Sequence, residues 1–302
     1  MTRPRVALVT ARAARGTDQD MPLLLAALGD AGAEAREVDW DDDTVDWSRF
    51  DLTLLRSTWD YFDRLPEFLA WAERVSRQTR LLNPLEVIRW NTDKHYLEDL
   101  ARAGVPVVPS MFVEPGGNAA GIVDALLALH SAARDIVVKP AVGAGSRDAQ
   151  RHARTRRDAI LAHIARLHDK GRSVLLQPYL ERVDEHGETA LLFFDGEFSH
   201  AIRKGPLLRR DEGPTAGLYA KETIEPRTPS ADELAIARGA LAAIPFERPL
   251  LYARADLIRD DAGSPQLLEL ELVEPSVFVA HADGAAERFA KAIMRRIAAR
   301  AG

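Results

Sequence analysis

Apolar residues alternate between short continuous runs and helix-spaced patterns at the start of the chain. Residues 5–10 and 50–56 are apolar runs typical of strands buried on both faces. Residues 18–33 and 65–78 carry apolar side chains at helical spacing, and a short strand follows at 80–84. This alternation predicts a parallel sheet flanked by helices.

A second, shorter alternation follows. A helix capped by Asn91 or Thr92 leads to the segment 105–110, where prolines bracket a short predicted strand. Three further elements are expected in order: a helix at 118–133, a strand at 135–139 and a helix at 155–170. Together these elements predict a second, smaller α/β unit.

The last third of the chain changes to paired strands. Residues 188–205 read as a hairpin around Asp195-Gly196, a dipeptide that favours a tight turn between antiparallel strands. Residues 251–275 read as a second hairpin, and 285–302 as an amphipathic helix. The fold class is therefore α/β, with α+β character in the C-terminal half.

Composition narrows the class of protein. The chain has 302 residues, 46% of them hydrophobic, which is enough for a large core in two or three packed units. Its net charge of -6 argues against a nucleic-acid binder, and the absence of cysteine excludes thiol catalysis and cysteine-ligated metals. No apolar window reaches the ~20 residues of a membrane span, and no secretory signal pattern is evident. We expect a cytoplasmic protein without a membrane partner.

Charged residues in the second hairpin share strand faces. Arg254 and Asp256 are two apart, as are Glu269 and Glu271, so each pair points to one side of its strand. If these strands pair, three carboxylates line one surface, and Mg²⁺ is the cation that such oxygens prefer together with phosphate. The alternative is a solvent-facing strand surface with spaced charges, because short acidic motifs are frequent by chance.

Two strand ends offer further chemistry. The strand 135–139 ends in Lys139, followed by a proline and a run of small residues up to Ser146. This is not a Walker A loop, since no Gly-Lys-Ser/Thr follows, so it is either another phosphate-holding loop or a glycine-rich turn. The strand ending at Gln177-Pro178-Tyr179-Leu180 could present backbone groups to an adenine edge, or be a plain strand-to-turn transition.

The order of these segments resembles the ATP-grasp superfamily, and within it the glutathione-synthetase-like branch, over nearly the whole chain. The resemblance implies three units that clamp ATP: a parallel-sheet substrate domain at 1–91, a central subdomain with a phosphate loop at 92–176, and a C-terminal subdomain with the adenine hinge and metal site at 177–302. It also implies ATP and Mg²⁺ as cofactors. The family usually has Asn where Glu271 stands, so this chain adds a negative charge there.

The resemblance also implies roles for individual residues. Lys94 and Lys139 match the lysines that reach ATP phosphates, and 141–146, with Ser146, matches the loop that closes over the γ-phosphate. Gln177, Tyr179 and Leu180 match the hinge that holds adenine. Glu188 matches the acid that binds ribose, and Asp184 is the weaker candidate for that role. The metal ligands match Asp256, Glu269 and Glu271, and the strand end that faces the phosphates matches Arg203 and Lys204. Arg203, Arg254 and Lys139 are the expected catalytic residues.

Substrate is expected at the end of the strand 50–56, since ligands bind at the carboxyl ends of parallel strands. Arg56 could take a substrate carboxylate in a bidentate manner, while Ser57, Thr58 and Asp60 could bind hydroxyl or amino groups. The alternative is a capped helix start with Arg56 on the surface. The partner is thus expected to be a small amino-acid-like molecule.

The N-terminal stretch is also similar to the small ATP-grasp branch that includes the D-cycloserine-forming cyclo-ligase, which acts on O-ureido-D-serine. This similarity implies that ATP phosphorylates the substrate carboxylate and that a nitrogen of the same molecule closes a five-membered ring, with carbamoyl loss as CO2 and ammonia. The segment 203–230 lacks strong periodicity and is expected to fold over the active site as a loop. Proteins of this branch are often dimers or tetramers, so the similarity is compatible with a homo-oligomer. Three alternatives stay open: a two-substrate carboxylate-amine ligase, a nucleotide-binding module without turnover, and a sugar or polyol kinase.

Overall fold

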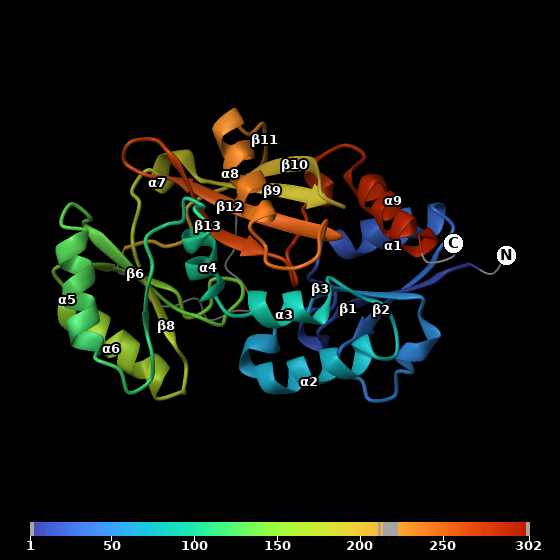
Figure 1. Cartoon of the computed structure of the whole chain (residues 1–302), viewed down its shortest axis with the longest axis horizontal. Helices are drawn as coiled ribbons and strands as arrows, with labels where there is room; N and C mark the ends of the chain where they lie inside the picture. The colour runs from blue at the N-terminus through green and yellow to red at the C-terminus, as the bar shows by residue number, and fades with distance from the viewer. Residues whose placement is uncertain (1–2, 211–212, 214–222, 300–302) are drawn as a thin grey trace.

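The computed structural model describes residues 3–210, 213 and 223–299. Three sheets follow one another along the chain, and helices cover their outer faces (Figure 1). The two ends of the described chain lie at the same end of the molecule, beside the first sheet (Figure 1). No helix within the described ranges is long and apolar enough to cross a membrane.

The first sheet is four-stranded and parallel, with the order β2-β1-β3-β4. Alternate residues of β1 serve opposite faces: Val6 and Leu8 pack against one helical layer, Ala7 and Val9 against the other. Its elements are β1 (Arg5–Thr10), α1 (Asp20–Asp30), β2 (Glu34–Asp39), β3 (Leu52–Ser57), α2 (Leu65–Ser76), β4 (Leu81–Leu82) and α3 (Leu85–Asn91), with short 3-10 turns at Arg12–Ala14, Trp47–Arg49 and Tyr61–Asp63. The predicted parallel sheet is therefore confirmed, with β2 an additional strand that the sequence pattern did not reveal.

The second sheet is antiparallel, with the order β5-β8-β6-β7. Helices α5 and α6 cover one face of it (Figure 1), through an apolar cluster that includes Val123, Ile136, Ile160 and Leu176. Its elements are α4 (Tyr96–Arg102), β5 (Met111–Val113), α5 (Ala119–Leu129), β6 (Asp135–Pro140), β7 (Gln150–Ala153), α6 (Arg157–His168) and β8 (Val174–Pro178).

Two details of this middle region differ from the sequence prediction. The segment 105–110 holds a single bridge from Val107 to Leu267, and the strand begins only at Met111. Asn91 does not cap the following helix: its side chain donates to Leu270 O at 2.7 Å and accepts from Leu272 N at 2.7 Å. Asn91 instead binds the C-terminal sheet, because a buried amide must find partners for both its donor and its acceptor.

The third sheet is five-stranded and antiparallel, with the order β11-β10-β9-β12-β13. Both predicted hairpins are present, and Asp195 and Gly196 have the positive φ angles, 55° and 82°, that their tight turn requires. Its elements are α7 (Val183–His186), β9 (Glu188–Phe194), β10 (Glu197–Lys204), β11 (Ile224–Arg227), α8 (Ala231–Ala242), β12 (Tyr252–Arg259), β13 (Pro265–Glu271) and α9 (Ala285–Ala298), with a 3-10 turn at Val279–His281.

The first and third sheets share one apolar core. Phe289 and Ile293 of α9 pack in the same cluster as Leu24 of α1 and Phe194 of β9. Asn83 adds polar links, because its side chain donates to Tyr252 O and Leu272 O and accepts from Leu251 N. The strands of the three sheets span 5–82, 111–178 and 188–271, while the expected divisions at 91 and 176 stay a prediction.

Candidate active site

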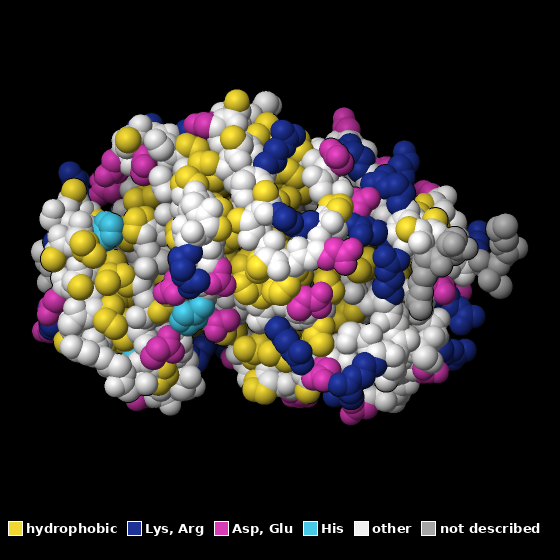
Figure 2. All heavy atoms as spheres, viewed as in Figure 1, with side chains coloured by type: hydrophobic (Ala, Val, Ile, Leu, Met, Phe, Trp, Pro, Cys, Tyr) yellow, Lys and Arg dark blue, Asp and Glu magenta, His cyan; other side chains and the backbone are white. Residues whose placement is uncertain are grey.

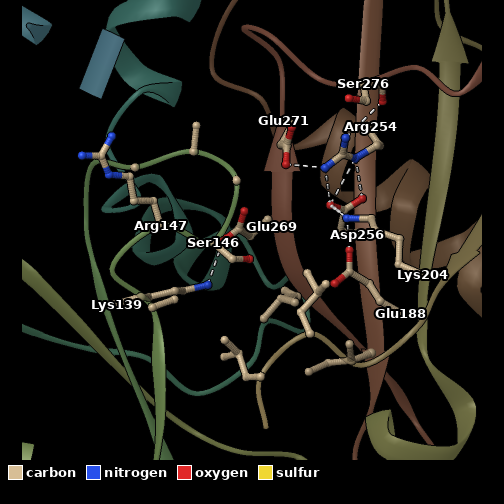
Figure 3. A pocket seen from close by; sticks show the side chains of 18 of the residues that line it. Lys139, Ser146, Arg147, Glu188, Lys204, Arg254, Asp256, Glu269, Glu271 and Ser276 are labelled. Atoms are coloured by element: carbon tan, nitrogen blue, oxygen red, sulfur yellow. Dashed lines mark hydrogen bonds and ion pairs between the residues drawn. The ribbon is translucent and has the colours of Figure 1, made fainter. Parts of the chain in front are cut away.

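One cavity of about 720 Å³ is lined by side chains from all three sheets and their connecting loops. The central sheet contributes Lys139 and the small-residue loop that follows it, and the C-terminal sheet contributes Arg254, Asp256 and Glu269 (Figure 3). The first sheet contributes the loop 17–20 after β1. Residues distant in sequence therefore meet at one place, as a nucleotide and a second substrate would require.

Among the cationic side chains that line the cavity, four are nearly buried: Lys94, Lys139, Lys204 and Arg254. Lys94 Nζ donates to the carbonyl of Gly143 at 3.0 Å, so it holds the small-residue loop. Lys139 Nζ donates to Glu269 Oε1 at 2.7 Å. These cations can neutralise bound phosphate groups, which is the main requirement of phosphoryl transfer.

Asp256, Glu269 and Glu271 lie on β12 and β13 and face the same cavity (Figure 3). Asp256 is the direct partner of Glu269 in the strand register, and Arg254 is the partner of Glu271. Asp256 accepts from Lys204 Nζ at 2.8 Å and from Arg254, which also bonds Glu271. The predicted shared strand face is thus confirmed, and protein cations partner all three carboxylates.

Burial and these cations set the ionisation of the three acids. Burial alone would raise the pKa of Glu269, but Lys139 and Lys94 outweigh it and lower the pKa to about 2. Arg254 and Lys204 likewise lower the pKa of Asp256 against its burial. Burial raises the pKa of Glu271 despite Arg254. Glu269 and Asp256 are therefore ionised oxygen donors at neutral pH.

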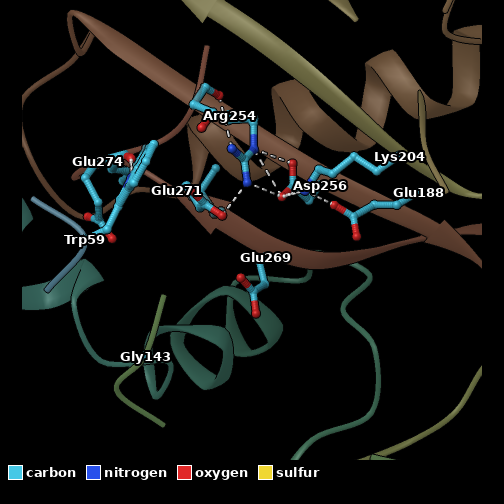
Figure 4. Close-up of polar contacts among 12 residues, drawn as sticks. Trp59, Gly143, Glu188, Lys204, Arg254, Asp256, Glu269, Glu271 and Glu274 are labelled. Atoms are coloured by element: carbon cyan, nitrogen blue, oxygen red, sulfur yellow. Dashed lines mark hydrogen bonds and ion pairs between the residues drawn. The ribbon is translucent and has the colours of Figure 1, made fainter. Parts of the chain in front are cut away.

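The described residues contain no group of three or more acidic or histidine side chains close enough to hold a metal ion alone. Arg254 lies between Asp256 and Glu271, which explains why these oxygens do not converge (Figure 4). Mg²⁺ is commonly held by one or two carboxylates together with phosphate oxygens and water. The donor set fits Mg²⁺ in that manner, with phosphate completing the coordination.

The expected adenine hinge also lines the cavity. Gln177, Tyr179 and Leu180 are all at its wall, and so is Glu188, which is paired with Lys204. The ring of Tyr179 lies 3.5 Å under the guanidinium of Arg151. Asp184 is not among the lining residues, because it accepts from Arg151 and from the Tyr179 hydroxyl.

The small-residue loop 141–146 follows β6 of the central sheet and packs against elements of the first sheet. Val142 and Ala144 pack against the apolar cluster under α2, and Arg172 donates to Val142 O at 2.7 Å. The next residue, Arg147, lies 3.3 Å from Asp63 and over the ring of Phe62. The loop, including Ser146, therefore borders the cavity in contact with the elements of the first sheet.

Comparison with known proteins agrees with this architecture. A family model described as "D-cycloserine synthetase DcsG, N-terminal domain" matches residues 6–83. The cycloserine biosynthesis protein DcsG of Streptomyces lavendulae is 45% identical over 296 residues, covering 97% of this chain and 98% of that protein. The chain belongs to the DcsG family.

Solved structures extend the comparison. The crystal structure of D-cycloserine synthetase DcsG matches with a TM-score of 0.91 and 44% identity, over 97% of this chain and 99% of that one. D-alanine–D-alanine ligase from Bacillus anthracis, complexed with ATP, matches with a TM-score of 0.70 and 15% identity, over 99% and 100% of the two chains. The second likeness shows the fold alone. This DcsG family member has the ATP-grasp fold.

The structure places Arg203 away from the cavity. Successive residues of a strand point to opposite faces, so Arg203 and Lys204 cannot both face the cavity. Lys204 faces it, whereas Arg203 donates to the carbonyls of His186 and Glu185 and lies outside the lining. Of the predicted loop 203–230, residues 204–208 and Ile224 line the cavity, and 224–227 form β11. Residues 211–212 and 214–222 lie outside the described residues.

The structure places the four predicted substrate residues, Arg56, Ser57, Thr58 and Asp60, outside the lining of the cavity. β3 is a central strand and buried along its length, so its end turns into the protein. Arg56 is 0% exposed and lies 3.5 Å from Asp20 and 4.0 Å from Asp18. Ser57 bonds Thr10, and Asp60 accepts from the Trp40 ring N–H at 2.9 Å.

Other residues line the cavity on the side of the first sheet. Asp18 lines the cavity from the loop after β1, and burial raises its pKa. Asp20 accepts the backbone N–H groups of Val277, Phe278 and Val279 at 2.7 to 3.0 Å, which fixes a segment that also lines the cavity. The acidic run after the first strand was a usable signal, because the ends of neighbouring parallel strands meet at one edge.

Glu274 was also missed. It lines the cavity three residues after Glu271, and its main-chain carbonyl accepts from the Trp59 ring N–H at 3.0 Å. Burial, and then the charge of Glu271, raise the pKa of Glu274 to about 8, against a hydrogen bond from Tyr61. Tyr61 also lines the cavity.

Proposed function

We propose that this chain cyclises O-ureido-D-serine to D-cycloserine in a reaction that consumes ATP and releases ADP, phosphate, CO2 and ammonia. The observation that carries the proposal is the single cavity in which Lys139, Lys204 and Glu269 face the acidic loop 17–20 of the first sheet. One side of that cavity suits a nucleotide phosphate, and the other suits a small amino acid. The 45% identity to a cycloserine biosynthesis protein supports this substrate.

The nucleotide is assigned to the side formed by the second and third sheets. ATP brings about four negative charges near neutral pH, and phosphoryl transfer needs them neutralised. Lys94, Lys139 and Lys204 supply positive charge, while Asp256, Glu269 and Glu271 would hold Mg²⁺. The metal supplies charge neutralisation at the transferring phosphoryl group when bound. Gln177, Tyr179, Leu180 and Glu188 are assigned to adenine and ribose.

The chemistry has two stages. The substrate carboxylate attacks the γ-phosphorus of ATP, which forms an acyl phosphate and releases ADP. A nitrogen of the same molecule then attacks the acyl carbon, closes a five-membered ring and expels inorganic phosphate. An intramolecular nucleophile gains rate from proximity, so no pocket for a second organic substrate is needed. Hydrolysis removes the carbamoyl group as CO2 and ammonia.

The decisive experiment supplies purified protein with ATP, Mg²⁺ and O-ureido-D-serine as the only organic substrate. ADP and phosphate are followed by coupled assay, and cycloserine by mass spectrometry. We expect all three products together, and little ADP from Lys139→Met under the same conditions. The matched control is Lys170→Met, which removes an exposed lysine and leaves product formation intact. ADP release that requires both an amino acid and an amine would instead indicate a two-substrate ligase.

A further inference from the structure

Glu274 occupies a distinct place among the acids of the cavity. It is 8% exposed and follows the strand that carries Glu269 and Glu271. Its main-chain carbonyl accepts a hydrogen bond from Trp59, and the Tyr61 hydroxyl acts on its carboxyl group; both residues come from the segment after β3. Glu274 therefore lies where the C-terminal sheet meets the substrate-side sheet, beside Trp59 in Figure 4.

The neighbours of Glu274 distinguish it from the other acids. Asp256, Glu269 and Glu271 are bonded to lysine or arginine, and Glu188 is paired with Lys204. Within the described ranges Glu274 forms no ion pair: Tyr61 bonds it, and Glu271, Lys94 and Arg254 act on it only through their charge. A carboxyl without a cation partner can gain and lose a proton more readily than a paired one.

Ring closure requires such a group. The attacking nitrogen carries a hydrogen that must leave as the bond to carbon forms, and the proposed phosphate site contains cations that cannot accept a proton. We propose that the Glu274 carboxylate accepts the proton lost by the ring-closing nitrogen, an inference that rests on the cyclisation proposed above. Tyr61 is the positioning residue that orients this carboxylate.

The proposed step balances in atoms and electrons. The nitrogen lone pair forms the new C–N bond, the bond between the acyl carbon and the phosphate oxygen breaks, and inorganic phosphate leaves with that electron pair. The N–H proton moves to a carboxylate oxygen of Glu274, which becomes a neutral carboxyl group and returns the proton to solvent. Burial and Glu271 raise the pKa of Glu274 to about 8, which makes its carboxylate a stronger base than an exposed one.

The test separates phosphorylation from ring closure in single-turnover reactions with ATP, Mg²⁺ and O-ureido-D-serine. For Glu274→Gln we expect the ADP burst within about twofold of wild type and acyl phosphate that hydroxylamine traps as hydroxamate. Cycloserine formation should fall about 100-fold or more, the usual effect of losing a general base. Glu274→Asp should restore part of the rate, and Glu287→Gln, an exposed change on α9, should leave it unaltered.

The pH profile gives an independent readout. The wild-type ring-closure rate should rise with pH to a plateau, and the Glu274→Gln rate should lose this dependence. Tyr61→Phe should fold normally and move the apparent pKa upward, because the Tyr61 hydrogen bond lowers the pKa of Glu274. A merely structural role for either residue would change the rate without moving the profile.

Several results would overturn the inference. One is a Glu274→Gln variant that closes the ring at the wild-type rate, and another is a variant that loses its ADP burst. A raised Mg²⁺ requirement of the variant would make Glu274 a metal ligand, and a raised substrate KM with unchanged kcat would make it a binding residue. Wild-type protein that yields no cycloserine from O-ureido-D-serine would refute the proposed cyclisation itself, and with it the role of Glu274. The wild-type and variant reactions therefore report the two failures separately.

Discussion

Lys139 Nζ lies 2.7 Å from Glu269 Oε1, and this contact joins two different sheets across the cavity. Lys139 comes from β6 of the central sheet and Glu269 from β13 of the C-terminal sheet. Lys94 lies 3.9 Å from the same oxygen. The Glu269 carboxylate thus faces both lysines that are assigned to the ATP phosphates. Because Glu269 is also an assigned Mg²⁺ ligand, its charge should affect both metal and phosphate binding.

Glu269→Gln should abolish most ATP turnover while the fold persists. The change removes one negative charge from the assigned Mg²⁺ ligands but keeps the size of the side chain. We expect kcat for ADP release to fall about 100-fold or more, as for loss of one strong electrostatic contact at a reacting centre. Circular dichroism checks the fold, and Glu287→Gln on the exposed face of α9 serves as control. Retained turnover would refute the metal assignment of Glu269.

Glu269 should also stabilise the fold in a pH-dependent manner. Its pKa is lowered to about 2 in the folded protein, below its ordinary value of 4.5. The stabilisation is therefore present above pH 4.5 and lost as the pH falls from 4.5 towards 2. We expect wild type to exceed Glu269→Gln by on the order of 2–3 kcal/mol in free energy of unfolding at pH 7, and the difference to shrink in acid. Urea denaturation of both proteins at several pH values measures it, and a constant difference would contradict the prediction.

Glu274 should have the opposite effect. Its pKa is raised to about 8 from an ordinary 4.5, so its contribution is fully present below pH 4.5 and is lost as the pH rises through 8. Glu274→Gln cannot ionise, and we expect it to become more stable than wild type by on the order of 3 kcal/mol by pH 9. Thermal melts of wild type and Glu274→Gln from pH 5 to pH 9 test this. A stability difference between the two proteins that stays constant over this range would show that Glu274 is ionised throughout.

Arg56 should matter for stability and not for nucleotide binding. Its side chain is 0% exposed and faces Asp18 and Asp20, so Arg56→Met leaves buried carboxylates without their cation. We expect a loss of about 3 kcal/mol in free energy of unfolding, the usual cost of breaking a buried ion pair. ATP affinity, measured by calorimetry on folded protein, should stay within about twofold, because Arg56 does not line the cavity. A twofold change in affinity corresponds to less than about 1 kcal/mol. Arg49→Met, at an exposed arginine, is the control.

Arg147 should affect the small-residue loop 141–146 modestly. Its contact with Asp63 is partly exposed, and exposed ion pairs contribute about 0–1 kcal/mol. Arg147→Ala should therefore raise KM for ATP by up to about fivefold and leave the melting temperature unchanged. Steady-state kinetics measure the effect, with Lys170→Ala as the control. An effect of more than about 100-fold would place Arg147 in direct contact with the reacting phosphate.

Elements with strong local signals were predicted well. β1, α1, α2 and β6 have uniform apolar runs or a clear helical period, and Asp195-Gly196 specifies its turn by backbone conformation alone. β2 and β7 were not predicted, because EAREVD and QRHA carry mostly polar residues. Their strand conformation depends on pairing with β1 and β6. Segments of this kind are stabilised by neighbours, which local patterns do not encode.

The sequence by itself determined the chemical inventory and the order of the elements that carry it. Spacing alone placed Arg254 with Asp256, and Glu269 with Glu271, because side chains on a strand alternate with a period of two. Only the tertiary structure decided which charges meet. Lys139 reaches Glu269 through the approach of two sheets, and Arg56 turns inward to Asp18 and Asp20. Glu274 faces Tyr61 and forms no ion pair with any residue that the structure describes. The physical reason is that ion pairing and burial depend on distances of a few ångströms between segments far apart in the chain.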